Sequence, residues 1–336
     1  MINWGVIGLG NMANKFCEAI QDLENANLKA VASTSKFRLN KFCNSYSVKK
    51  EYQFNSYDDL INCKDVDAVY ICSLNNTHFN ILKSCCEKNK KILCEKPFVI
   101  NLEQANKIGE LILANKILFY EAIAYRSHPQ TREILSIIEN DVIGKIKKIE
   151  SSFGFKVRKI KKESRLFNKE FGGGAILDLG CYPISFVELF KKGNKEIKIT
   201  KIEGSKVFTG VDDHAEINYI INDDINVEIK VSLKENLENN CIIYGQKGTL
   251  KVLSPWLPEK KSILEVNQNN SYYKKFVVSD KSVYSNQINL ISSNFLGKKI
   301  ASKIEGVNFN QSLEIMKILE TWKKKLEKKI ENTVPN

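Results

Sequence analysis

Residues 2–13 of this 336-residue chain read INWGVIGLGNMA, an apolar strand pattern that runs into a glycine-rich turn. The turn has the spacing Gly8-x-Gly10-x-x-Ala13, and a helical pattern follows it. Gly8 permits a tight turn, Gly10 lets a pyrophosphate approach the backbone, and Ala13 allows the helix to pack closely on the strand. The N–H groups at the start of such a helix attract phosphate. This context predicts a dinucleotide site that contains Gly8, Gly10, Asn11, Met12 and Ala13.

The first third of the chain alternates short apolar strands with helical patterns. Strands are expected at residues 2–7, 28–32, 66–72, 91–94 and 117–121, and helices at residues 14–23, 77–89 and 102–115. Such alternation predicts a parallel, doubly wound α/β sheet. We therefore expect residues 1–122 to form a dinucleotide-binding Rossmann domain.

The period of the pattern changes after about residue 122. Apolar residues occupy every second position from 225 to 233, and this strand is expected to pair with residues 214–221. A second hairpin turn is expected at residues 245–248. Helices are expected at residues 128–139, 175–191 and 312–330. Residues 123–336 are thus predicted to form an α+β domain with a mostly antiparallel sheet that has one buried face.

The end of the second strand bears on the choice of cofactor. An NAD-specific site usually places Asp or Glu there, but residues 33–38 read STSKFR and contain no acid. Hydroxyl groups and cations suit a 2′-phosphate, so the sequence favours NADP, with NAD as the alternative. The residues expected to contact this end of the cofactor are Ser33, Thr34, Ser35, Lys36 and Arg38.

A lysine, a carboxylate and a phenol follow in two further motifs. Glu95-Lys96-Pro97 comes directly after the strand at residues 91–94, and residues 172–183 read GGGAILDLGCYP. On one helix, Asp178 and Tyr182 would share a face. Lys96 could bind a substrate hydroxyl and lower the pKa of a nearby phenol. Together with the glycine turn, this set predicts an alcohol dehydrogenase that uses nicotinamide.

Each of these residues also has a structural interpretation. Asp178 suits a helix start, Tyr182 suits a core or an interface, and Lys96 suits a solvated surface. Arg126 and His128 could line a substrate pocket, although His128 equally suits a helix start.

Composition excludes several other classes. The formal charge of +12 comes mostly from lysines spread along the chain, which gives no support for a nucleic-acid partner. No apolar run has the length of a membrane span, and the N-terminus shows no signal-peptide pattern. The nine cysteines contain no Cys-x-x-Cys pair, and the three histidines form no metal motif. We expect free thiols, no metal, no membrane contact and a cytoplasmic location.

The three motifs, together with EAIAYRSHPQ at residues 121–130 and the hairpin at residues 245–250, resemble the Gfo/Idh/MocA family of oxidoreductases. The resemblance implies a second domain with a large open sheet, and homodimers or homotetramers formed through it. It implies Lys96 and Asp178 as active-site residues and Tyr182 as the acid/base. The nicotinamide side of the cofactor is expected to meet Leu74, Asn75, His78, Glu95 and Lys96.

Two positions depart from the family pattern. Leu74 stands where a proline is usual, and Thr34 stands where NADP-binding relatives commonly have arginine. Tyrosine at position 182 resembles the branch of NADP-dependent sugar dehydrogenases and dihydrodiol dehydrogenases.

The function expected from these observations is oxidoreduction of a small-molecule sugar or polyol, with NADP as cofactor. Two alternatives stay open. One is a dehydrogenase of trans-dihydrodiols or other non-sugar alcohols, and the other is a regulatory protein that binds a dinucleotide without catalysis.

Overall fold

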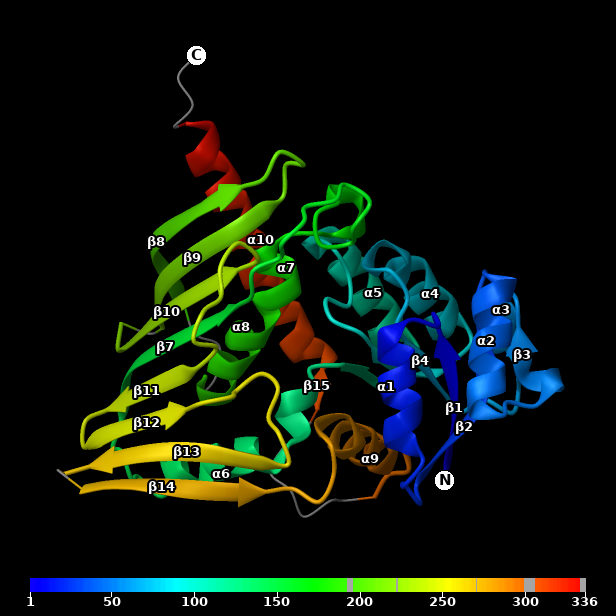
Figure 1. The fold of residues 1–336 in the computed structure, drawn as a ribbon, viewed down its shortest axis with the longest axis horizontal. Helices are drawn as coiled ribbons and strands as arrows, with labels where there is room; N and C mark the ends of the chain where they lie inside the picture. Colours follow the sequence, from blue (N-terminus) through cyan, green and yellow to red (C-terminus); the bar gives the residue numbers. More distant parts are fainter. Residues whose placement is uncertain (192–195, 222, 270, 299–305, 333–336) are drawn as a thin grey trace. The chain divides into compact units, whose positions relative to one another are not determined.

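The computed structural model describes residues 1–191, 196–221, 223–269, 271–298 and 306–332, and the chain divides into two compact units (Figure 1). The first unit holds Met1–Ser127 and Lys281–Leu313, and the second holds His128–Asp280 and Glu314–Asn336. The division differs from the predicted single boundary at residue 122, because a segment from the C-terminal third belongs to the first unit.

The first unit contains a seven-stranded sheet. Its strands are β1 (Ile2–Ile7), β2 (Ala26–Ala32), β3 (Gln53–Phe54), β4 (Ala68–Ile71), β5 (Lys91–Cys94), β6 (Phe119–Glu121) and β15 (Val307–Asn308). They lie in the order β15-β6-β5-β4-β1-β2-β3, and all neighbours are parallel except β15 and β6. The order reverses at β1, where such sheets bind ligands outside the carboxyl ends of the strands. The predicted doubly wound sheet is confirmed, and Gly8 follows β1 at that edge.

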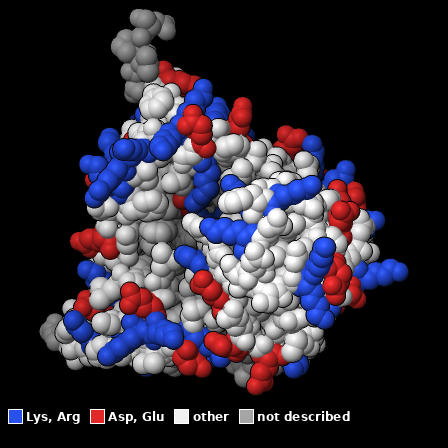
Figure 2. Space-filling view, turned by 45° about the vertical axis from the view of Figure 1, so that its right-hand side comes forward, with Lys and Arg blue, Asp and Glu red and all other residues white. Residues whose placement is uncertain are grey.

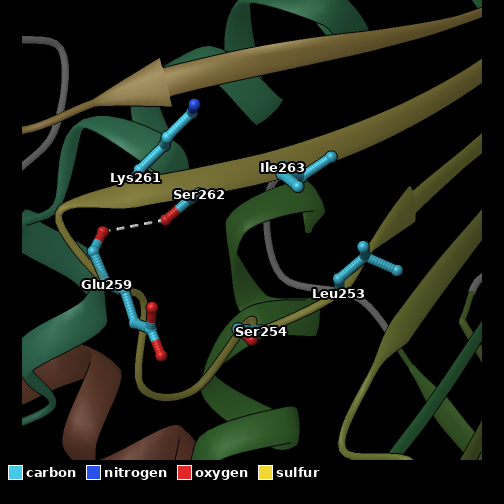
Figure 3. Close-up of a pocket in the computed structure, with 6 residues that line it drawn as sticks. All are labelled: Leu253, Ser254, Glu259, Lys261, Ser262 and Ile263. Atoms are coloured by element: carbon cyan, nitrogen blue, oxygen red, sulfur yellow. Dashed lines mark hydrogen bonds between the residues drawn. The ribbon is translucent and has the colours of Figure 1, made fainter.

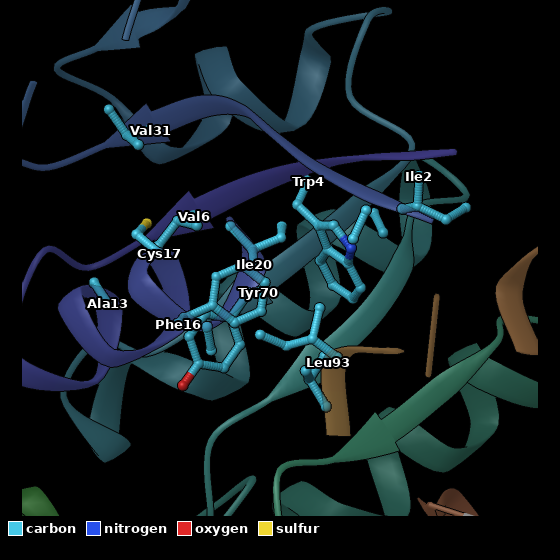
Figure 4. Packing of buried hydrophobic residues seen from close by; sticks show 14 of the residues in the cluster. Ile2, Trp4, Val6, Ala13, Phe16, Cys17, Ile20, Val31, Tyr70 and Leu93 are labelled. Carbon is cyan, nitrogen blue, oxygen red and sulfur yellow. The ribbon is translucent and has the colours of Figure 1, made fainter. Parts of the chain in front are cut away.

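Helices surround this sheet, and one of them explains the division of the chain. They are α1 (Asn11–Ile20), α2 (Lys36–Tyr46), α3 (Tyr57–Asn62), α4 (Asn75–Glu87), α5 (Leu102–Ala114) and α9 (Val283–Phe295), with short 3₁₀ turns at Lys50–Tyr52 and Ala124–Ser127. Trp4 of β1 packs against Phe16 of α1 and Phe295 of α9, with ring centroids 5.4 and 5.6 Å apart (Figure 4 labels Trp4 and Phe16). The Trp4 indole also donates a hydrogen bond to Ser292 Oγ, 3.0 Å away. The apolar face of α9 therefore completes the core of the first unit.

The second unit contains an eight-stranded sheet. Its strands are β7 (Ile146–Gly154), β8 (Ile197–Lys206), β9 (Asp212–Ile221), β10 (Ile225–Ser232), β11 (Cys241–Gly245), β12 (Gly248–Val252), β13 (Lys261–Gln268) and β14 (Ser271–Val278). They lie in the order β14-β13-β12-β11-β7-β10-β9-β8, and only β7 and β10 run parallel among the described pairs. The predicted, mostly antiparallel sheet is confirmed, and Val227, Ile229 and Val231 of β10 are buried as their alternation requires.

The helices of the second unit include one clear difference from expectation. They are α6 (Pro129–Glu139), α7 (Ala175–Leu179), α8 (Cys181–Val187) and most of α10 (Phe309–Glu331), with 3₁₀ turns at Lys169–Phe171 and Glu188–Phe190. The single helix expected over residues 175–191 is wrong, because the chain breaks at Gly180. Pro183 lacks an N–H, and inside one long helix its ring would clash with the carbonyl of Leu179. Pro183 is tolerated in the first turn of a new helix, and α8 begins two residues before it. Figure 1 shows α7 and α8 on one face of the eight-stranded sheet.

Candidate active site

The glycine turn after β1 has the shape that a dinucleotide needs. Gly8 has φ of +92°, and a Cβ there would lie 2.6 Å from the backbone of Ser73. Gly10 differs, because a Cβ there would meet no atom within 4 Å. Gly10 also precedes α1 without a side-chain cap, so no N-cap side chain satisfies the first N–H groups of this helix. Gly8 is thus required by the fold, whereas Gly10 leaves room for a pyrophosphate.

The predicted residues at the end of β2 divide into two groups. Ser33 is buried and accepts a hydrogen bond from the N–H of Ser35 (3.2 Å), and Ser35 caps α2 by accepting one from the N–H of Arg38 (3.4 Å). Thr34, Lys36 and Arg38 are exposed. The two serines therefore shape the turn, while the exposed side chains are available to a 2′-phosphate.

One exposed ring at the start of α2 is not among the predicted site residues. Phe37 lies between Lys36 and Arg38, and its side chain is 77 % exposed. An exposed aromatic ring next to the residues expected to bind the 2′-phosphate is a candidate surface for the adenine ring. The only signal in the sequence was its position next to the two cations.

The turn after β4 places the predicted nicotinamide-side residues. Leu74 is exposed and precedes α4, and Asn75 is buried at the start of that helix. The hydroxyls of Ser73 and Thr77 lie 2.7 Å apart, which closes the turn. His78 is completely buried on α4, so its ring is not exposed to a cofactor in this structure.

Glu95 and Lys96 follow β5 at the same edge of the sheet. Both are half-buried, and a cis peptide bond joins Lys96 to Pro97. The hydroxyl of Tyr70 on β4 donates a hydrogen bond to Glu95 Oε1 across 2.6 Å. Tyr70 in turn stacks on Phe16 of α1 with centroids 4.3 Å apart, so the core of the first unit fixes Glu95.

In the second unit, Asp178 of α7 forms an ion pair that the sequence did not reveal. Arg165 Nη1 lies 2.8 Å from Asp178 Oδ1. The Asp178 side chain is 7 % exposed and the Arg165 side chain 49 %. The pair sets hydrogen-bond donors and acceptors side by side, an arrangement that suits a substrate with several hydroxyl groups. No pattern in the sequence connects residues 13 positions apart through an irregular loop.

Tyr182 belongs to the next helix, α8. Its ring meets Phe153 of β7 edge-to-face at 5.2 Å, and Phe153 lies next to Trp256 at 6.1 Å. The Tyr182 residue is only half-buried, whereas its neighbours Cys181 and Pro183 are buried. Aromatic packing therefore orients the phenol without enclosing the whole side chain.

Asp212 of β9 holds the start of α7, the helix that carries Asp178. Its Oδ2 accepts a hydrogen bond from the N–H of Ile176 (2.7 Å), and a Cβ at Gly174 would collide with its carboxylate. Burial raises the Asp212 pKa from 3.8 to about 6, although the Ile176 N–H opposes this shift.

The raised pKa of Asp212 makes stability depend on pH. The folded state favours the protonated carboxyl over the ionised one. The stabilising contribution of the protonated carboxyl is therefore complete below pH 3.8 and is lost as pH rises through about 6. We expect Asp212→Asn to remove this decline and to raise the free energy of unfolding at pH 7 by up to about 3 kcal/mol. Urea unfolding of both proteins between pH 4 and pH 7 measures this. An unchanged decline in the variant would contradict the assignment.

Arg126 and His128, the predicted substrate residues, are both buried. Arg126 is 3 % exposed, and His128 is 0 % exposed. The Nδ1 atom of His128 accepts a hydrogen bond from the N–H of Gln130 (3.1 Å) at the start of α6. Burial lowers the His128 pKa to about 4. The structure therefore favours the helix-start interpretation of His128.

The distribution of charge is less even than predicted. Figure 2 shows basic and acidic side chains interspersed over the face in view. Residues 156–169, however, contain seven Lys or Arg and one Glu. This basic segment includes Arg165 and leads into α7.

A small hollow is lined by Leu253, Ser254, Glu259, Lys261, Ser262 and Ile263 (Figure 3), none of which is a predicted site residue. No cluster of His, Cys, Asp or Glu in the described parts could hold a metal ion. Among the described helices, none is long and apolar enough alone to cross a membrane. One pair, Lys169–Leu179 with Cys181–Phe190, passes by length and composition and is bent by 44°.

Comparison with known proteins defines the family. The model of an oxidoreductase family with an NAD-binding Rossmann fold matches residues 2–122, and the GFO/IDH/MocA C-terminal domain matches residues 131–251. The chain belongs to the Gfo/Idh/MocA family, as its motifs indicated. It is an NAD(P)-dependent oxidoreductase that acts on hydroxyl or carbonyl groups.

Individual relatives are more distant. Trans-1,2-dihydrobenzene-1,2-diol dehydrogenase of Xenopus tropicalis is 28 % identical over 258 residues, which cover 76 % of each chain. The same enzyme of Danio rerio is 26 % identical and covers 86 % of this chain and 84 % of its own.

Two solved structures share the fold at low identity. An aldose-aldose oxidoreductase from Caulobacter crescentus, complexed with glycerol, has a TM-score of 0.86 at 16 % identity and covers 97 % of this chain and 98 % of its own. A 3-ketoreductase from Actinomadura kijaniata, in complex with TDP-benzene and NADP, has a TM-score of 0.81 at 20 % identity and covers 95 % and 96 %. At these identities the two structures confirm the fold alone.

Proposed function

We propose that this protein is an NADP-dependent dehydrogenase or reductase of a sugar or polyol. The observation that carries the substrate class is the pairing of Asp178 with Arg165 at 2.8 Å, close in sequence to the phenol of Tyr182. A carboxylate accepts and a guanidinium donates, so the pair can bind neighbouring hydroxyl groups of one substrate.

Four residues of the chain would each have a separate role in catalysis. When bound, the nicotinamide cofactor supplies or accepts the hydride. Tyr182 takes the proton from the substrate hydroxyl during oxidation and returns it during reduction. Lys96 favours the phenolate through its positive charge. Asp178 orients the substrate, and Arg165 holds the Asp178 carboxylate in place.

The cofactor would bind along the carboxyl edge of the first unit's sheet. The helix start after Gly10 suits the pyrophosphate, since a Cβ there would project into open space. Lys36 and Arg38 would hold the 2′-phosphate, with Phe37 beneath the adenine. Leu74, Asn75 and Lys96 would lie toward the nicotinamide.

The cations after β2 lead to a prediction about cofactor choice. We expect NADP to bind about tenfold more tightly than NAD, a difference of about 1.4 kcal/mol. One charge-assisted phosphate contact can supply this energy. The double variant Lys36→Ala/Arg38→Ala should lose the preference without losing NAD affinity, whereas Phe37→Ala should weaken both cofactors equally. Titrations with both cofactors measure this, and a wild-type preference for NAD would show that the missing arginine at Thr34 is decisive.

A second candidate function is oxidation of trans-dihydrodiols. The curated relatives, at 25–28 % identity, carry this activity in their names. A screen at 340 nm with aldoses, polyols, nucleotide sugars and trans-dihydrodiols, each with NAD and NADP, separates the two functions. Cofactor binding with no turnover on any of these compounds would favour a regulatory protein.

We also propose assembly and location. A homodimer or homotetramer would form through the eight-stranded sheet, whose edge strand β14 exposes Tyr272, Phe276 and Val278. Light scattering of the purified protein measures the number of subunits, and a monomer would contradict this.

All nine cysteines are free, which supports a reducing compartment, the cytoplasm. Fractionation of the producing cells tests the location.

A further inference from the structure

Two buried side chains hold the short turn that carries Lys96. The first is His78, which reaches the turn from α4. Its Nδ1 atom lies 3.1 Å from the carbonyl oxygen of Pro97, and its Nε2 atom lies 3.2 Å from the carbonyl oxygen of Ser73. His78 therefore lies between the turn after β4 and the turn after β5, both at the cofactor edge of the sheet.

The second side chain is Glu121, at the end of β6. Its Oε1 atom accepts a hydrogen bond from the N–H of Phe98 (3.1 Å), and the residue is 2 % exposed. Burial raises the Glu121 pKa to about 7, and the positive charge of Lys96 opposes that shift. The carboxyl group thus binds the backbone two residues beyond Lys96 and also senses the Lys96 charge.

We propose that His78 and Glu121 are positioning residues that hold the Lys96-Pro97-Phe98 turn from two sides and thereby place the Lys96 ammonium for proton transfer. The proposal rests on the proposed function only for the consequence in catalysis. The structural part of the proposal, that these side chains fix the turn, rests only on the contacts of His78 with Pro97 and of Glu121 with Phe98. It gives His78 a role behind the cofactor site rather than in contact with the cofactor.

The protonation of His78 decides which carbonyl it holds. Burial lowers the His78 pKa to about 4, so at pH 7 the ring is neutral and has one N–H. Pro97 is buried, whereas Ser73 is half-buried, so water can serve the Ser73 carbonyl more readily. An unsatisfied carbonyl costs more in the buried position, and we therefore place the proton on Nδ1, donating to Pro97.

Two amide variants test this assignment. The side-chain NH₂ of asparagine reaches the position of Nδ1, and that of glutamine reaches the position of Nε2. We expect His78→Asn to keep kcat within about threefold of the wild type, and His78→Gln to lower kcat about 10- to 100-fold with little change in NADP affinity. Leu82→Ala, which removes a buried side chain one turn later on α4, is the control for lost packing. It should lower the melting temperature but not kcat.

The outcomes separate clearly. Equal kcat values for the two amide variants would overturn the proposal, as would loss of kcat in His78→Asn alone. A change confined to KM or to cofactor affinity would also overturn it.

Glu121 is tested by hydrogen exchange as well as by activity. Glu121→Gln keeps an acceptor for the Phe98 N–H, whereas Glu121→Leu removes it. We expect exchange at Phe98 to become at least about tenfold faster in Glu121→Leu and to stay near wild type in Glu121→Gln, with kcat following the same order. Unchanged exchange in Glu121→Leu would overturn the proposal. This measurement needs no substrate. It therefore tests whether Glu121 fixes the Lys96-Pro97-Phe98 turn even if the screen of sugars and polyols finds no turnover.

Discussion

Tyr182→Phe is expected to lower turnover by about 10²- to 10⁴-fold, the usual contribution of a general acid or base. Phenylalanine keeps the ring that meets Phe153 edge-to-face at 5.2 Å, so packing should survive. Only the hydroxyl is lost, and with it the group that we propose exchanges a proton with the substrate. NADP affinity should stay nearly unchanged, because the proposed cofactor residues lie in the first unit.

The measurement compares kcat, KM and NADP affinity of the variant on the substrate that the screen identifies. Phe153→Leu is the matched control, because it alters the aromatic contact but keeps the phenol. It should cost much less in kcat than Tyr182→Phe. Near-normal turnover of Tyr182→Phe would show that the phenol is structural and that another group moves the proton.

The first unit could be predicted from local patterns because its signals are short in sequence. Each apolar strand, the Gly8 turn and each helix that follows is a contiguous stretch of sequence. Parallel strands joined by a helix follow a right-handed connection, and this rule limits the possible strand orders. The strands at residues 2–7 and 91–94 and the turn between β1 and α1 were located correctly. The helix Val283–Phe295 was not, because its place depends on contacts of Phe295 and Ser292 with Trp4, far away along the chain.

The candidate site was harder to predict where side chains meet through space. Lys96 and Asp178 could be chosen by motif, but their partners could not. Glu121 binds the N–H of Phe98, in the turn of Lys96, from 23 residues further along the chain than Phe98. Arg165 reaches Asp178 from an irregular loop. The break at Gly180 also separates Asp178 from Tyr182, although a four-residue spacing suggested one helix. Periodicity reports which face is buried, but it carries no information on such contacts.

Gly10→Val is expected to weaken NADP binding by at least about 100-fold while the fold survives. A Cβ at Gly10 would meet no protein atom within 4 Å, so the valine side chain would enter open space at the start of α1. We propose that the pyrophosphate approaches the helix N–H groups through that space, so the side chain would exclude it. The cost to the free protein should be modest, since an unfavourable residue before a helix typically costs about 1 kcal/mol.

Gly8 supplies the opposite case and makes the comparison decisive. A Cβ at Gly8 would lie 2.6 Å from the backbone of Ser73, and the φ of +92° is strained for any L side chain. Gly8→Ala should therefore lower the melting temperature or prevent folding, whereas Gly10→Val should melt near the wild-type temperature and fail to bind NADP. Thermal melts and NADP titrations of the two variants measure this. An unchanged NADP titration for Gly10→Val would show that the cofactor binds elsewhere, because a Cβ at this position meets no protein atom within 4 Å and so disturbs no side-chain packing.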